Sequence, residues 1–397
     1  MRYGLGAALV ALLMLTGCGD EARPGAPSTD GVGTNNGAAT NNGAETNNGE
    51  DGPAQRVLPP GPWSAEAYGY YGVGATSTEV STTASDGEAR QFRVAIWYPT
   101  LDEDAARPDG TGPAARIDAT VALTAPAPVM VFSHGSGGFP EQSTFLTDFF
   151  VSHGWIVVAP SHKGNDVIGQ PIDVRFFMWR PEDISATLDH VQALPAEHRL
   201  HGLLSDDVVV AGHSFGGYTA LALAGARFDL GEIRARCRSL GICGWLDAGA
   251  EGILEGGFED PRFKLAIALA PAGSRIFYGG VSETQIPVLL VTAGGDQTLP
   301  NDVEGDLIWE AMDGPDDVRL NIISAGHYSF TDLCASLGSF FADDGCGPAF
   351  TPAARVHGWV NTYGLAFVRV HLFGDATDAD LIDGTRRLAS GMIVNVK

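Results

Sequence analysis

Six short, continuous runs of apolar residues follow one another along the chain, and this repetition constrains the fold more than any other feature. The runs occupy residues 129–132, 155–159, 208–211, 265–269, 288–292 and 320–323. Continuous runs of this length are typical of parallel strands that are covered on both faces. We therefore expect each run to be a buried strand of one sheet.

Helical periodicity appears between several of these runs, at residues 142–153, 181–194, 216–226 and 352–373. Pro181 is followed by two acidic residues, which is typical of a first helical turn, so we expect a helix to begin there. Alternation of strands and helices predicts an α/β fold, a doubly wound, mostly parallel sheet with helices on both faces. Residues 76–83 and 90–98 flank Ser85-Asp86-Gly87 and predict an antiparallel hairpin before this core.

The first 18 residues have the features of a secretory signal: Arg2, an apolar run from Leu5 to Leu15, and small residues before Cys18. The run is shorter than the roughly 20 residues that span a bilayer. Leu15-Thr16-Gly17-Cys18 resembles the bacterial lipobox, which implies acylation of Cys18 and anchoring to the cell envelope, at the periplasm or the cell surface. An ordinary cleaved signal that contains Cys18 by chance is the alternative.

Residues 19–60 are rich in Gly, Asn and Thr and repeat Thr-Asn-Asn-Gly at 34–37, 40–43 and 46–49. A repeat without apolar residues has nothing to bury, so we expect a flexible tether. Residues 61–397 are then expected to form one domain, with a Gly-rich insertion at about residues 228–262 near the site.

The charge balance excludes several partners. The 397 residues include 24 Lys and Arg against 48 Asp and Glu, which gives a net charge of −24. Such a chain offers no basic field for phosphates, so we expect no nucleic-acid partner and membrane contact only through the lipid anchor. The high charge also favours a monomer.

Four cysteines remain if Cys18 carries lipid, and disulfides persist in exported domains. Three pairings are possible, and the short loops favour Cys237–Cys243 and Cys334–Cys346, with free buried thiols as the alternative. We expect no metal site, because the chain has no CxxC or His-rich spacing. The acidic stretch 375–383 lacks EF-hand spacing, which favours a solvated face over a calcium site.

The segment Gly212-His213-Ser214-Phe215-Gly216 lies between a predicted strand and a helix of small residues. Its turn is so tight that the residues two before and two after the serine must lack side chains, which makes the hydroxyl of Ser214 project above the sheet. The following helix directs free N–H groups and its dipole toward negative charge formed beside Ser214. A serine hydroxyl is a weak nucleophile, so a base is required.

Two further polar residues follow predicted strands, Asp296 after residues 288–292 and His327 after residues 320–323. Ligands of α/β sheets bind at these strand ends. Ser214, Asp296 and His327 follow one another in the order serine, acid, histidine. We expect His327 to take and return the serine proton while Asp296 orients it. A turn aspartate and a solvated histidine are the structural alternatives, and Asp302 and Asp306 are the other candidate acids.

The loop Ser133-His134-Gly135-Ser136-Gly137-Gly138 follows the first central strand and resembles the HG-rich loop of lipases and esterases. We assign the backbone N–H groups of Ser136 and Phe215 as the oxyanion hole, with a plain strand-to-helix turn as the alternative. His134 and His213 lie in glycine turns and are expected to be structural donors.

The segments GHSFGGYTA, FSHGSGG and AGHYSFTD together resemble the bacterial relatives of platelet-activating-factor acetylhydrolase, often labelled dienelactone-hydrolase-like, in the α/β-hydrolase superfamily. The resemblance covers about residues 65–375. It implies hydrolysis of carboxylic esters, of small molecules or lipids, without a cofactor or metal. Dienelactone hydrolases use a cysteine nucleophile, whereas this chain has Ser214, so that chemistry is not carried over.

Other interpretations remain open at the level of the sequence. The triad does not choose its acceptor, so acyl transfer or amide cleavage would use the same residues, and a non-catalytic binding module could keep the fold. The run from Arg175 to Arg180 would line an acyl pocket if it lies in a loop after Pro160, or belong to the core.

Overall fold

The computed structural model describes residues 61, 63–102, 115–167, 173–236 and 242–397. The predicted signal, Cys18 and the tether lie outside these residues, as does Cys237 and with it the Cys237–Cys243 pairing. Within the described part of the chain, no helix is both long and apolar enough to cross a membrane.

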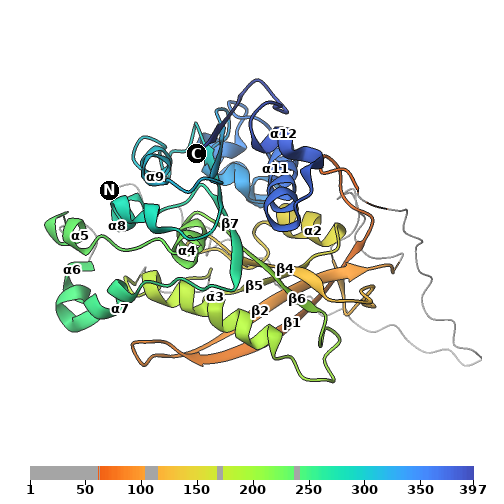
Figure 1. Cartoon of the computed structure of the whole chain (residues 1–397), viewed down its shortest axis with the longest axis horizontal. Coiled ribbons are helices and arrows are strands. Elements are labelled where there is room, and N and C mark those ends of the chain that lie inside the picture. Colours follow the sequence, from red (N-terminus) through yellow and green to blue (C-terminus); the bar gives the residue numbers. More distant parts are fainter. Residues whose placement is uncertain (1–60, 62, 103–114, 168–172, 237–241) are drawn as a thin grey trace, which may run out of the picture. The chain divides into compact units, whose positions relative to one another are not determined.

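One mixed sheet forms the centre of the domain (Figure 1). Its ten strands within the described residues are β1 (Gly72–Thr83), β2 (Ala89–Thr100), β3 (Arg116–Ile117), β4 (Ala127–Ser133), β5 (Ile156–Pro160), β6 (Leu204–His213), β7 (Phe263–Leu269), β8 (Val288–Ala293), β9 (Val318–Ile322) and β10 (Met392–Val396). They lie in the order β10-β9-β8-β7-β6-β4-β5-β2-β1-β3. The six strands from β9 to β5 are parallel, as predicted, and β2 and β10 join them antiparallel at either side.

Most of the longer helices connect parallel strands, and the longest lies between β9 and the antiparallel β10. The longer helices are α2 (Thr144–Ser152), α3 (Phe176–Gln192), α4 (Phe215–Leu223), α9 (Gly305–Ala311) and α11 (Ala353–Phe373). The described part of the predicted insertion contains α5 (Leu230–Arg236), α6 (Ile242–Trp245) and α7 (Glu251–Gly256), which lie between α4 and β7. Shorter helices are α8 (Ser274–Phe277), α10 (Leu333–Leu337) and α12 (Ala379–Ile382).

The core has two layers because side chains of a strand alternate between its faces. On β4, Val129 and Val131 pack with the apolar side chains of α3 and α4, whereas Met130 and Phe132 pack with those of α2 and α11. The two sets of helices therefore cover opposite faces of the sheet (Figure 1). This arrangement confirms the doubly wound fold.

The predicted start of the second helix is wrong, because α3 begins at Phe176 and contains Pro181. Proline has no N–H to donate to the carbonyl four residues earlier, which usually leaves that oxygen without a partner. Here the Tyr218 hydroxyl donates to the carbonyl oxygen of Phe177 at 2.5 Å and supplies the missing bond. Residues 176–180 are therefore helical rather than a loop, and Met178 and Arg180 are fully buried, as the core alternative predicted.

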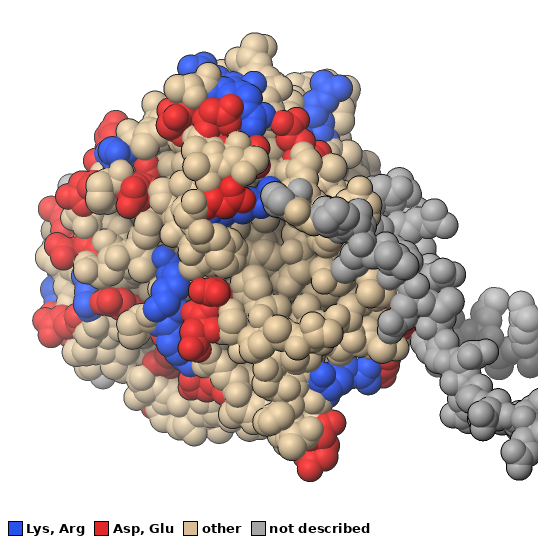
Figure 2. Space-filling model, turned by 45° about the vertical axis from the view of Figure 1, so that its right-hand side comes forward, with Lys and Arg blue, Asp and Glu red and all other residues tan. Residues whose placement is uncertain are grey.

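Charged side chains of both signs are mixed around the face that Figure 2 shows. Ion pairs among the described residues include Arg93 with Glu141 at 2.5 Å and Arg386 with Glu66 at 2.8 Å. In the acidic stretch 375–383, Asp378 and Asp380 also pair with Arg386.

Candidate active site

Ser214 lies on the sharp turn between β6 and α4. Its φ of 59° and ψ of −117° are costly for a residue with a side chain, so the surrounding structure must hold this conformation. A Cβ at Gly216 would lie 1.8 Å from the carbonyl oxygen of Ser133, and one at Gly212 would lie 2.2 Å from that of Gly216. These contacts explain why both positions lack side chains. Ser214 itself is partly exposed, while Gly212, His213 and Phe215 are buried.

Asp296 and His327 meet above the ends of β8 and β9. The Nδ1 atom of His327 lies 2.7 Å from Oδ2 of Asp296, and both residues are buried. The other carboxylate oxygen of Asp296 accepts the backbone N–H of Leu299 at 2.6 Å. The two other candidate acids do not take this place, because Asp302 is exposed and Asp306 pairs with Arg319 at 2.5 Å.

The surroundings of His327 favour its protonated form. Burial alone would lower the pKa of His327, but the charge and hydrogen bond of Asp296, together with the charge of Asp344, raise it above its ordinary value. Because Nδ1 faces a carboxylate, the proton of the neutral ring belongs on Nδ1, and Nε2 is the basic nitrogen. The pair can therefore accept a proton at Nε2.

His213, the residue before Ser214, connects the turn to the His327 loop. Its Nε2 donates to the carbonyl oxygen of His327 at 3.1 Å, and its Nδ1 accepts from the Gln142 side chain at 3.1 Å. Burial, and then the charge of His327, lowers the pKa of His213 well below its ordinary range, consistent with a neutral ring. His213 is thus a structural donor, as predicted.

Among the described residues, the Ser214 hydroxyl makes no hydrogen bond. The structure therefore joins Asp296 to His327 directly, and it connects the turn that carries Ser214 to the His327 loop through His213. The hydrogen bond between a nucleophile and its base is often long in a free enzyme and tightens when substrate is bound.

The loop after β4 bonds several of its own N–H groups but not that of Ser136. Gly135 donates to the Gln142 side chain at 3.2 Å, Gly137 to the carbonyl of Asn165 at 3.0 Å, and Gly138 to that of Gly135 at 3.1 Å. The N–H of Ser136 has no acceptor among the described residues. Phe215 begins α4, where N–H groups lack intrahelical partners. Both predicted oxyanion donors are thus free to bind a ligand.

A buried polar network below this loop was not predicted from the sequence. Ser133 Oγ lies 2.9 Å from Nε2 of His162, and Nδ1 of His162 lies 3.0 Å from Asp183. Asp183 accepts two hydrogen bonds from Arg90, each 2.6 Å long. The fully buried Arg180 donates to Ser133 Oγ at 3.0 Å and to the carbonyl of His134. The sequence signals this network only through Arg180, a charged residue that directly follows the apolar residues 176–179.

A ferulic acid esterase from Streptomyces cinnamoneus is similar in structure, with a TM-score of 0.56 and 20% sequence identity over 87% of this chain and 98% of that chain. The chain has the α/β-hydrolase fold. A model of the chlorophyllase family matches residues 114–234, which include the loop after β4 and Ser214 but end before Asp296 and His327. No curated protein matches the chain. These similarities support the α/β-hydrolase esterases as the general class of this protein, in agreement with the sequence motifs.

Proposed function

We propose that this α/β-hydrolase is an exported serine hydrolase that cleaves carboxylic esters through an acyl-enzyme. Ser214 is the nucleophile, His327 the base and acid, and Asp296 the residue that orients His327. The observation that carries the proposal is the strained, partly exposed Ser214 at φ 59°. Its neighbour His213 is hydrogen-bonded to the backbone carbonyl of His327, and the ring of His327 is bonded to Asp296.

The chemistry follows from the proton positions. Ser214 Oγ attacks the ester carbonyl carbon and gives its proton to Nε2 of His327, while Asp296 stabilises the imidazolium. His327 then gives that proton to the leaving alkoxide as the C–O bond breaks, which leaves Ser214 acylated. A water molecule, activated by the same nitrogen, attacks the acyl group and restores the free serine.

The negative charge on the carbonyl oxygen needs donors fixed before the reaction. The N–H groups of Ser136 and Phe215 supply them from two different loops, and α4 adds the positive end of its dipole. Removal of one such donor typically costs about 3 kcal/mol in the barrier.

Covalent labelling tests this proposal directly. A fluorophosphonate probe should label the folded wild-type protein and Ser133→Ala but not Ser214→Ala, because the proposal places the reactive hydroxyl on the partly exposed Ser214, whereas Ser133 is buried. Failure to label folded wild-type protein would reject the hydrolase.

The substrate we propose is a small-molecule or lipid ester, as in the platelet-activating-factor acetylhydrolase branch. Rates on p-nitrophenyl esters of increasing acyl length, on a short-chain phospholipid and on a ferulic acid ester would rank these classes. Hydrolysis of the p-nitrophenyl esters alone would leave the lipid branch without support.

For location, we propose a lipid anchor on Cys18. When cells are fractionated, the wild type should stay with the membranes and the Cys18→Ser variant should appear in the soluble fraction. Equal release of both would leave an ordinary signal peptide as the explanation.

A further inference from the structure

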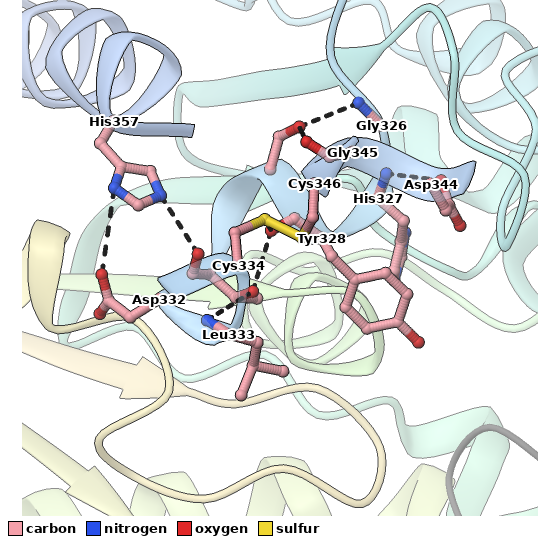
Figure 3. Close-up of a disulfide and its surroundings, with 12 residues drawn as sticks. Gly326, His327, Tyr328, Asp332, Leu333, Cys334, Asp344, Gly345, Cys346 and His357 are labelled. Atoms are coloured by element: carbon pink, nitrogen blue, oxygen red, sulfur yellow. Dashed lines mark hydrogen bonds and ion pairs between the residues drawn. A yellow bond between two sulfur atoms is a disulfide. The ribbon is translucent and has the colours of Figure 1, made fainter. Parts of the chain in front are cut away.

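The segment between Cys334 and Cys346 folds back against both loops of the candidate site. Its ends are joined by a disulfide with a Cα–Cα distance of 5.0 Å, which confirms one of the two predicted pairings. Figure 3 shows this disulfide beside His327, with the backbone N–H of His327 directed at Asp344. Asp344 is buried, and sequence reasoning gave it no role.

One carboxylate thus holds the loops that carry Asp296 and His327. Oδ1 of Asp344 accepts the backbone N–H of His327 at 2.9 Å and that of Gln297, the residue after Asp296, at 3.0 Å. Its Oδ2 accepts the Thr298 hydroxyl at 2.7 Å. Hydrogen bonds to a charged acceptor are stronger than neutral ones, so these three contacts fix one loop relative to the other.

The position of Asp344 is itself held from several sides. A Cβ at Gly326 would lie 2.5 Å from the carbonyl carbon of Asp344, so the two backbones touch. The Ser329 hydroxyl donates to the carbonyl of the next residue, Gly345, at 3.1 Å. The disulfide holds Cys346, two residues after Asp344, to Cys334. Asp344 therefore has little freedom to move without His327.

We propose that Asp344 is a positioning residue, which sets the geometry of the His327–Asp296 pair by binding the backbones of both loops. This inference rests on the proposed function for its catalytic consequence. Among the described residues, Asp344 makes no hydrogen bond to the imidazole ring or to Ser214, so it acts through the loops that carry His327 and Asp296. The charged and titratable groups around His327 include Asp296, His213 and Asp344, and also Tyr328, whose ring packs edge-on against the imidazole.

The test compares Asp344→Ala and Asp344→Asn with Asp343→Asn. Asp343 is exposed and adjacent, so its variant makes the same change of charge without the three contacts. We expect Asp344→Ala to lower kcat on a p-nitrophenyl ester about 100-fold with KM within about twofold, since small misplacements of catalytic groups have effects of this size. Asp344→Asn keeps an oxygen acceptor but loses the charge, so its kcat should fall less and its pH–rate midpoint should move to lower pH. Asp343→Asn should match the wild type.

A spectroscopic readout separates this inference from the proposed function. The proton between His327 Nδ1 and Asp296 should give a downfield NMR resonance that is lost in His327→Gln, whether or not the protein is a hydrolase. We expect this resonance to shift or broaden in both Asp344 variants and to stay in place in Asp343→Asn. An unchanged resonance and unchanged kcat in Asp344→Asn would overturn the role of Asp344. If Asp344→Ala does not fold, Asp344→Asn carries the test.

Discussion

Two arrays of serine, histidine and aspartate lie in the described part of the molecule, and they differ in hydrogen bonding, charge and exposure. In the buried array, Ser133, His162 and Asp183 form a continuous chain of hydrogen bonds of 2.9 and 3.0 Å. In the second array, above the ends of β8 and β9, His327 is bonded to Asp296, but Ser214 is not bonded to His327. Judged by hydrogen bonds alone, the buried array would be the better triad.

Charge distinguishes the two arrays. Burial, followed by the charges of Arg180 and Arg90, lowers the pKa of His162 well below its ordinary range, so its ring resists protonation. For His327, the charge and hydrogen bond of Asp296 outweigh burial and raise its pKa. A general base must accept a proton, so burial together with the charges of two arginines makes His162 unsuited to that role.

The two serines also differ in backbone conformation and solvent exposure. Ser133 is fully buried at the end of β4 and pairs with Gly212 in the sheet, whereas Ser214 is partly exposed on a strained turn. The buried array joins β4, the residues after β5, and α3 below the proposed oxyanion loop. We infer that the buried array holds that loop in place, and that Ser214, His327 and Asp296 carry out the reaction.

The largest change in kcat is expected for Ser214→Ala. Removing the nucleophile should lower kcat on the order of 10⁶-fold, as for serine nucleophiles in general, with no loss of folding. Steady-state kinetics with a p-nitrophenyl ester, beside a circular dichroism spectrum, would measure both. Residual activity near the wild-type value would move the nucleophile elsewhere.

The two aspartates should separate activity from stability. We expect Asp296→Asn to lower kcat about 10⁴-fold while the protein stays folded, because the amide disfavours the required tautomer of His327. Asp183→Asn should instead reduce the free energy of unfolding by about 3 to 5 kcal/mol, because it leaves Arg90 buried without a counter-charge. Urea unfolding and kcat, measured on both variants, check this division. The comparison fails if Asp183→Asn is the more damaging to kcat and leaves stability unchanged.

Much of the fold could be predicted because its signals are local. The six apolar runs became β4 to β9, and the requirement for glycine around Ser214 follows from sterics within five residues. The strand β10 was missed, because it is a short edge strand whose apolar run, Met392–Val394, has only three residues, of which only Met392 is buried. Its place is set by pairing with β9, which the sequence does not display.

What could not be predicted depends on partners distant in sequence. The start of α3 was misplaced because the hydroxyl that compensates for Pro181 comes from Tyr218, which bonds Phe177 across 41 residues. Asp344 lies in a segment without periodicity, and only the folded chain brings it to Gln297. Asp296 and His327 were recognisable because strand ends mark them.

A smaller effect is expected for Ser133→Ala. The change removes the hydroxyl that links Arg180 to His162 and leaves both buried groups short of a partner. We expect a loss of about 1 to 3 kcal/mol in the free energy of unfolding and a kcat within a few-fold of the wild type. Urea unfolding compared with initial rates would show it. A kcat as low as that of Ser214→Ala would instead place the buried array in the reaction.

The smallest effect is a displacement of the pH–rate profile. Only neutral His327 can act as the base, so kcat/KM should rise with pH as this ring loses its proton. Because its pKa is raised, the midpoint should lie above the ordinary histidine value of about 6.5. The buried His162 and His213, whose pKa values are lowered, stay neutral through this range and add no second step. Asp296→Asn should move the midpoint of the residual activity downward, since it removes the charge that raises the pKa of His327. A wild-type midpoint below 6.5 would mean that burial outweighs Asp296, and the electrostatic distinction between the two arrays would then be lost.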